Sequence, residues 1–160
     1  MKKEKEYFSI VVEGTKSKCP IGEKIGEENM KHGRIPVISC EGACIRGEIA
    51  RIAANHVAKE KFFARGCHGE LFAVPDSFIS KWIKNSEKVV LIDGCFLKCH
   101  ERIMKGIIDE DKIIHFDALS YYKKYTDKFG IDEVPQKERE EVGIDVANWV
   151  LACMKANLNT

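Results

Sequence analysis

The chain has 160 residues, a length typical of one domain, and 26 basic against 25 acidic residues give it a net charge of +1. This balance, with no patch of interleaved basic and aromatic residues, argues against nucleic-acid binding. The apolar run at 7–12, YFSIVV, is too short for a signal peptide, and no run approaches the about 18 apolar residues of a membrane span. We therefore expect a cytoplasmic protein that acts on neither nucleic acid nor membranes.

From residue 35 onward, short apolar runs alternate with segments whose apolar residues recur at helical spacing. The runs predict strands at 35–40, 61–67, 88–95 and 112–119. The segments between them predict helices at 47–60, within 68–85 from about Pro75 onward, and at 96–107, and a long final helix covers 134–157. This alternation predicts a three-layer α/β fold with a parallel sheet, flavodoxin-like or Rossmann-like, in the strand order 2-1-3-4.

We expect a single α/β domain at 35–160, preceded by an N-terminal arm at 1–34. Residues 7–14, YFSIVVEG, leave open one additional strand. The segment 17–34 is rich in glycine and charge, and it predicts an irregular arm. In the final helix, Val142, Val146 and Trp149 share an apolar stripe that fits either the core or a homodimer contact.

Cysteine is the unusual feature of the composition. Three of the seven cysteines end predicted strands, and two lie four residues further on, at the starts of helices: Cys40, Cys67 and Cys95, then Cys44 and Cys99. Because parallel strands end at one edge of the sheet, these five thiols should converge there, where α/β folds bind ligands. Helix N-termini favour thiolates, and in a reducing compartment such a cluster points to metal or thiol chemistry. Cys153 is expected in the core, and Cys19 is expected to be incidental.

Other polar residues near these cysteines are expected to play supporting parts. His68 and His100 each follow a cysteine directly, so their side chains should point elsewhere and serve at the surface or behind the ligands. Asp93 precedes a glycine and should accept hydrogen bonds from turn amides. His115 lies within a predicted strand and should be satisfied in or beside the core.

Three segments together resemble the DGC-domain family, a zinc-associated family named for an Asp-Gly-Cys motif: SCEGACIRGEIA (39–50), RGCHGE (65–70) and VVLIDGCFLKC (89–99). The resemblance implies a zinc site built from Cys40, Cys44, Cys67, Cys95 and Cys99, and it implies no established reaction. The first pair is C-x3-C where the family pattern leads us to expect C-x2-C. Four sulfur ligands would close the site, whereas a missing ligand would leave a position for water. An iron–sulfur cluster is the less favoured cofactor, because no ferredoxin-like spacing is present.

A second resemblance supports a competing hypothesis. The C-x5-R spacing from Cys40 to Arg46 is similar to the phosphate loop of low-molecular-weight tyrosine phosphatases and arsenate reductases. It implies Cys40 as the nucleophile, Arg46 as the oxyanion clamp, and Asp117 or Asp93 as the general acid. Gly47 stands where those enzymes carry Ser or Thr. Metal-free thiol redox or sulfur-transfer chemistry is a third alternative, so the sequence leaves open whether the chain is an enzyme.

Overall fold

The structure, a computed structural model, describes residues 5–159. Its centre is a four-stranded parallel sheet with the order β2-β1-β3-β4. The strands are β1 (Ile35–Ser39), β2 (Phe63–Arg65), β3 (Val89–Asp93) and β4 (Ile113–Asp117). The predicted α/β fold and strand order are therefore confirmed.

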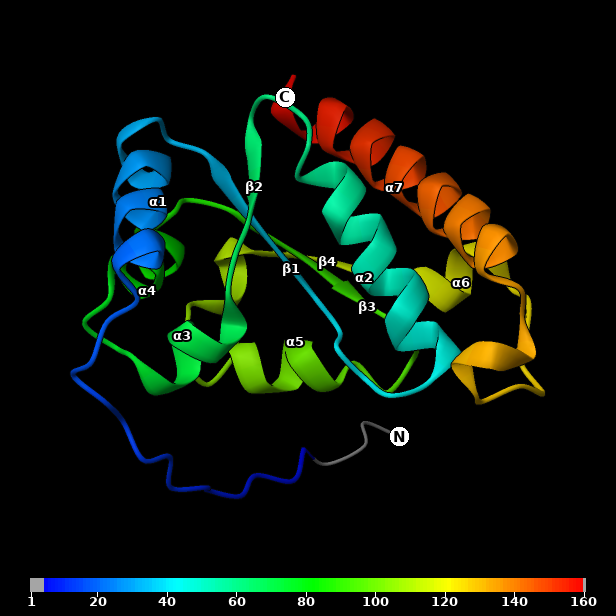
Figure 1. The fold of residues 1–160 in the computed structure, drawn as a ribbon, viewed down its shortest axis with the longest axis horizontal. Helices are drawn as coiled ribbons and strands as arrows, with labels where there is room; N and C mark the ends of the chain where they lie inside the picture. The colour runs from blue at the N-terminus through cyan, green and yellow to red at the C-terminus, as the bar shows by residue number, and fades with distance from the viewer. Residues whose placement is uncertain (1–4, 160) are drawn as a thin grey trace.

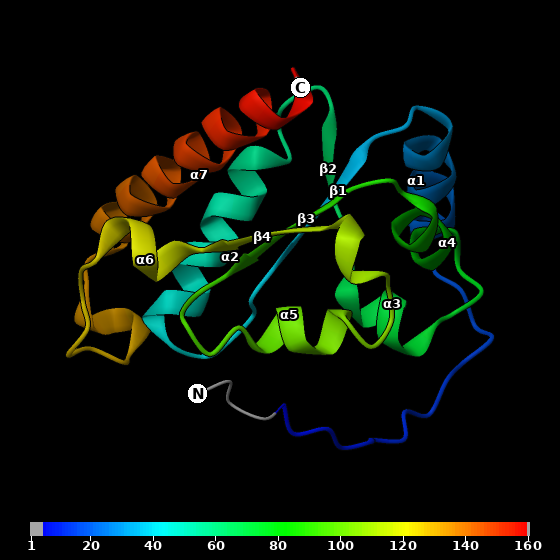
Figure 2. The ribbon, with the colours of Figure 1, turned by 180° about the vertical axis from the view of Figure 1, so that it is seen from behind.

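Helices cover both faces of this sheet (Figures 1 and 2). One apolar core lies beneath α2 and α7, and the other beneath α3, α4 and α5. The helices are α1 (Pro20–Lys31), α2 (Ile45–Val57), α3 (His68–Ala73), α4 (Phe78–Asn85), α5 (Cys99–Met104), α6 (Ala118–Tyr122) and α7 (Gln136–Leu158), with 3-10 turns η1 (Glu110–Lys112) and η2 (Ile131–Glu133).

The inner strands read as continuous apolar runs because both of their faces are buried. Successive side chains of a strand point to opposite faces. Val37 of β1 and Ile92 of β3 accordingly face the α2 and α7 core, whereas Ile38 and Leu91 face the α3, α4 and α5 core. All five residues of β3 are buried, which places its last residue, Asp93, inside the molecule.

The N-terminal segment differs from expectation, because residues 20–31 form a helix where an irregular arm was predicted. Cys19 caps α1 through its sulfur, which accepts a hydrogen bond from Gly22 N at 3.3 Å, and Pro20 occupies the first helical position. A Cβ at Gly26 would lie 2.5 Å from Ile79 N, so this glycine lets α1 lie directly against α4. Gly26, which weakens the helical signal in the sequence, is thus required by packing.

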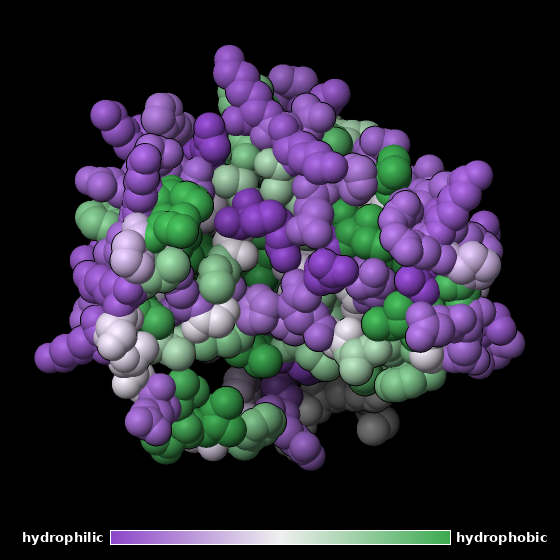
Figure 3. Space-filling model, in the orientation of Figure 1, coloured by the Kyte–Doolittle hydropathy of each residue, from purple (hydrophilic) through white to green (hydrophobic). Residues whose placement is uncertain are grey.

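Residues 5–19 form neither helix nor strand, and the extra strand considered at 7–14 does not form. The segment follows the side of the molecule on which α3 and α5 lie (Figure 1). Its apolar side chains, Tyr7, Phe8, Ile10, Val11 and Val12, are exposed, and apolar atoms show on this lower edge in Figure 3. The division of the chain at residue 34 stays a prediction.

The other differences concern element boundaries. A separate short helix, α3, precedes α4, because Cys67 and Ser77 each cap a helix of their own and residues 74–77 interrupt the pattern. Among the described residues, no helix combines the length and apolarity needed to cross a bilayer.

Candidate metal centre

The backbone at the carboxyl ends of β1 and β3 is packed too tightly for side chains at two glycines. A Cβ at Gly47 would lie 2.3 Å from the carbonyl oxygen of Gly42, and a Cβ at Gly94 would lie 2.7 Å from the carbonyl oxygen of Arg46. These contacts hold the loop after β1 against the turn after β3. Residues that follow the two strands are therefore brought side by side, as the sequence predicted for this edge of a parallel sheet.

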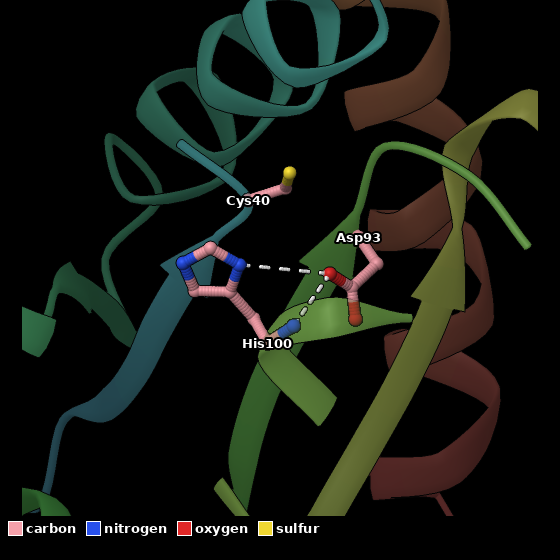
Figure 4. A group of neighbouring side chains, drawn as sticks. All are labelled: Cys40, Asp93 and His100. Atoms are coloured by element: carbon pink, nitrogen blue, oxygen red, sulfur yellow. Dashed lines mark hydrogen bonds and ion pairs between the residues drawn. The ribbon is translucent and has the colours of Figure 1, made fainter. Parts of the chain in front are cut away.

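Three potential metal ligands meet at this point. The Sγ of Cys40, a carboxylate oxygen of Asp93 and a ring nitrogen of His100 all lie within 4.8 Å of one another. Figure 4 shows the three side chains, which come from the end of β1, the end of β3 and the first turn of α5. Cys40 and His100 are half-buried, and Asp93 is buried. The centre is thus formed by segments that are far apart in the sequence.

Asp93 is the fixed part of this group. Its Oδ1 accepts the backbone N–H of His100 at 3.2 Å, and its Oδ2 accepts the N–H of Glu101 at 3.0 Å. His115 Nε2 also donates to Oδ2, at 3.1 Å. Burial opposes ionisation of Asp93, but the hydrogen bonds from His115, Glu101 and His100 outweigh it and lower the pKa of this carboxyl. Asp93 is therefore held as a carboxylate in one orientation, and it does accept amide hydrogen bonds as the sequence predicted.

The surroundings of Cys40, unlike those of Asp93, favour the uncharged form of its side chain. Burial raises its pKa, and the nearby Asp93 and Cys44 raise it further, although N–H groups of Gly42 and Gly94 bond to the sulfur and act in the other direction. The Gly42 N–H lies 3.3 Å from Sγ. A bound cation would favour the thiolate strongly enough to reverse this balance. In the absence of a cation, the raised pKa of Cys40 favours its neutral thiol.

His100 supplies an unsatisfied ligand atom. Its Nδ1 is enclosed, has no hydrogen-bond partner among the described residues, and lies 3.8 Å from Asp93 Oδ1. The ring packs edge to face against His68 with 5.2 Å between centroids. Burial, and then the charge of His100, lower the pKa of His68, which favours neutral imidazole. A buried nitrogen without a partner beside a thiol and a carboxylate fits a metal ligand.

The other four cysteines predicted as ligands also lie near this edge. Cys44 is the N-cap of α2, Cys67 is the N-cap of α3, and Cys99 is the first residue of α5. Cys95 lies two residues beyond Asp93 and is half-buried. All seven cysteines are free thiols. Of the five predicted ligands, Cys40 belongs to the close group of three, and ligation by the remaining four stays a prediction.

The residues of the phosphatase hypothesis have other contacts. Arg46 Nη2 donates to the carbonyl oxygen of Thr126 at 3.2 Å. Asp117 caps α6, because its Oδ1 accepts the N–H of Ser120 at 3.3 Å. The assignment of Cys40, Arg46 and Asp117 as catalytic residues stays a prediction.

Sequence reasoning did not select His100 or Asp93 as ligands. It expected His100 to point away from the metal because its neighbour Cys99 was assigned as a metal ligand. Lys98 adopts a left-handed conformation (φ 52°), which starts α5 so that Cys99 is exposed and His100 faces inward. A bulky residue in this conformation leaves no clear signal in a sequence.

Comparison with known proteins agrees with the pattern of motifs. The DGC domain family model matches residues 36–142, which is two thirds of the chain. No curated protein and no solved structure gives a significant match. The matched region includes all four strands except the first residue of β1, and every residue of the Cys40, Asp93 and His100 group. The chain therefore belongs to the DGC domain family.

Proposed function

We propose that the chain binds a zinc ion at the carboxyl edge of its sheet, with Cys40, Asp93 and His100 as ligands. The observation that carries the proposal is the meeting of one sulfur, one oxygen and one nitrogen ligand atom within 4.8 Å. Zinc accepts all three donor types, whereas calcium and magnesium prefer oxygen alone. The enclosed Nδ1 of His100, for which the described residues supply no hydrogen-bond partner, supports the same conclusion.

The fourth position around the ion is the finer part of the proposal. We assign it to a thiolate of Cys44, Cys67, Cys95 or Cys99, or to water. Cys44 is the best supported of these, because it lies near enough to raise the pKa of Cys40. A fourth sulfur would make the site structural, and an open position would allow the ion to supply Lewis acidity there.

The hydrogen bonds that Asp93 accepts orient this ligand before an ion binds. Donors from His100, Glu101 and His115 hold the carboxylate in place before any ion binds. Such partners orient a ligand and reduce the ordering cost of binding. His115 is therefore a positioning residue in this proposal, not a ligand.

Cobalt(II) titration of chelator-treated protein tests the proposal, because cobalt takes zinc sites and its absorption spectrum reports thiolate ligands. We expect a saturable thiolate-to-metal band at one cobalt per chain. Cys40→Ser should remove or weaken this band and His100→Ala should weaken cobalt binding, whereas Cys153→Ser and His56→Ala, both on helices away from the site, should not. Equal cobalt binding by Cys40→Ser and Cys153→Ser would refute the proposed ligand set.

A further inference from the structure

A second set of unsatisfied polar atoms lies on the α2 side of the same edge. Arg46 Nε and Tyr122 Oη are both enclosed, and neither has a hydrogen-bond partner among the described residues. Arg46 lies in the first turn of α2 and Tyr122 at the end of α6. Both side chains lie against the same segment, because Arg46 Nη2 donates to the carbonyl oxygen of Thr126 at 3.2 Å and the Tyr122 ring lies 6.2 Å from that of Tyr125, between centroids. Each unpaired buried group costs free energy that a hydrogen-bonding ligand would recover.

The charge of Arg46 indicates what kind of ligand would fit. Arg51, Arg65 and Arg139 each lie within ion-pair distance of a carboxylate. Among the described residues, Arg34, Arg46 and Arg102 have no carboxylate within that distance, and of these three Arg46 is half-buried whereas the other two are exposed. A water molecule could accept a hydrogen bond from Nε, but it would leave the positive charge uncompensated, whereas an anion would satisfy both requirements.

Tyr122 is suited to donate its hydroxyl proton to such an anion. Burial, followed by the thiols of Cys44 and Cys95 and the carboxylate of Asp117, raises its pKa, and Arg46 only partly opposes them. The hydroxyl therefore remains protonated at neutral pH. Asp117 is the acidic group that faces this pair, and its Oδ1 is already engaged by Ser120 N.

The segment 123–130 covers this pair. Its Thr126 carbonyl oxygen accepts a hydrogen bond from Arg46 Nη2 at 3.2 Å, and its Phe129 carbonyl oxygen accepts the N–H of Ile45 at 2.9 Å. Lys123 and Tyr125 in this segment adopt left-handed conformations (φ 50° and 58°), which are unfavourable for residues other than glycine. Tyr125 also bonds to Glu138, and the N–H groups of Phe129 and Gly130 bond to Glu133. Displacement of the segment would break these bonds, release the left-handed residues and open Arg46 and Tyr122 to a ligand.

We propose that Arg46 and Tyr122 form a binding site for a small oxyanion, of the size of phosphate, beneath the 123–130 segment. The guanidinium would compensate the charge of the anion, and its Nε–H and the Tyr122 hydroxyl would donate hydrogen bonds to two of the oxygens. The site lies beside the metal centre but is built from different side chains. Binding of the oxyanion is therefore expected with or without zinc.

Calorimetric titration with inorganic phosphate, at an ionic strength held constant with chloride, tests this proposal in both zinc-loaded and chelator-treated protein. We expect saturable binding at one site in both forms. Loss of a charged hydrogen-bonding partner should make Arg46→Gln bind phosphate roughly tenfold more weakly or worse. Arg51→Gln, an exposed arginine on the same helix, is the matched control and should bind as the wild type does. Asp117→Asn should bind more tightly, because it removes a negative charge that faces the site.

Tyr122→Phe keeps the test decisive if Arg46→Gln does not fold. It should weaken phosphate binding several-fold without lowering the melting temperature in phosphate-free buffer, because the deleted hydroxyl has no partner there. A lowered melting temperature with unchanged phosphate affinity would mean that a water-bonded structural hydroxyl was removed, and would overturn the proposal. No saturable binding to the wild type, or equal weakening by Arg46→Gln and Arg51→Gln, would also overturn it. Phosphate binding that requires zinc and is unaffected by Arg46→Gln would place the anion on the metal instead.

Discussion

Replacement of Asp93 by asparagine tests how the centre is held before an ion binds. The side chain is 1% exposed and accepts three hydrogen bonds, at 3.2, 3.0 and 3.1 Å. Asparagine keeps one acceptor oxygen but turns an NH2 group toward a donor, so at least one charged hydrogen bond is lost and one buried donor is left unpaired. Such losses cost about 1.5–3 and about 1–3 kcal/mol, so we expect Asp93→Asn to lower the free energy of unfolding by about 3 kcal/mol.

Urea unfolding of chelator-treated protein at neutral pH measures this change without any contribution from metal. Asp117→Asn is the matched control, because Asp117 is the register partner of Asp93 on β4 and asparagine caps a helix as well as aspartate does. We expect the control to change the free energy of unfolding by less than about 0.5 kcal/mol. If Asp93→Asn were as mild as the control, the carboxylate would not be held as described.

The difference in the free energy of unfolding between wild type and Asp93→Asn should also depend on pH, with a definite sign. The pKa of Asp93 in the folded protein lies below its ordinary value of 3.8. Its contribution to stability is therefore complete above that value and is lost as the pH falls through the lower folded pKa. The stability difference between wild type and Asp93→Asn should shrink as the pH is lowered through this range, and a difference that grows in acid would contradict the assignment.

Two further predictions concern packing, and both are measured by urea unfolding. Gly47→Ala would place a Cβ 2.3 Å from a carbonyl oxygen and should lower the free energy of unfolding by at least about 2 kcal/mol. The control Gly69→Ala, whose Cβ would lie 3.9 Å from the nearest contact, should lower it by less than about 1 kcal/mol. Similar losses in the two variants would mean that the loop after β1 is not tightly packed. Leu91→Ala, at a fully buried position of β3, should lower the free energy of unfolding by about 2–5 kcal/mol. Leu158 is 47% exposed, so Leu158→Ala should lower it by less than about 1 kcal/mol. A loss of less than about 1 kcal/mol in Leu91→Ala would contradict the place of Leu91 between the sheet and α5.

The strands and their order could be predicted because each buried parallel strand is a short apolar run with helical segments on both sides. The convergence of Cys40 with the end of β3 follows from the same topology. The helix α1 was missed because Gly22 and Gly26 lower the helical signal, although Pro20 after a capping residue was a usable indication. These glycines serve contacts with α3 and α4 that sequence periodicity does not report.

The composition of the metal group was harder to predict than its position. Sequence reasoning chose the five cysteines by their type and spacing, and regarded the histidines as supporting residues. The direction of each side chain at the start of α5 depends on the left-handed conformation of Lys98. The spacing of the cysteines therefore could not predict that His100 faces the metal group. Similarly, the role of Asp93 depends on its burial at the end of β3, beside Cys40.

The most direct test of the central claim is the zinc content of the purified protein, combined with a count of reactive thiols before and after zinc removal. Chelator-treated protein reloaded with zinc should hold one ion per chain, and the Cys40 thiol should react only after the ion is removed. Cys40→Ser should retain much less zinc, and Cys153→Ser should retain as much as the wild type. A wild-type protein that holds no zinc, or a Cys40 thiol that reacts equally in both forms, would contradict a metal centre at this edge of the sheet.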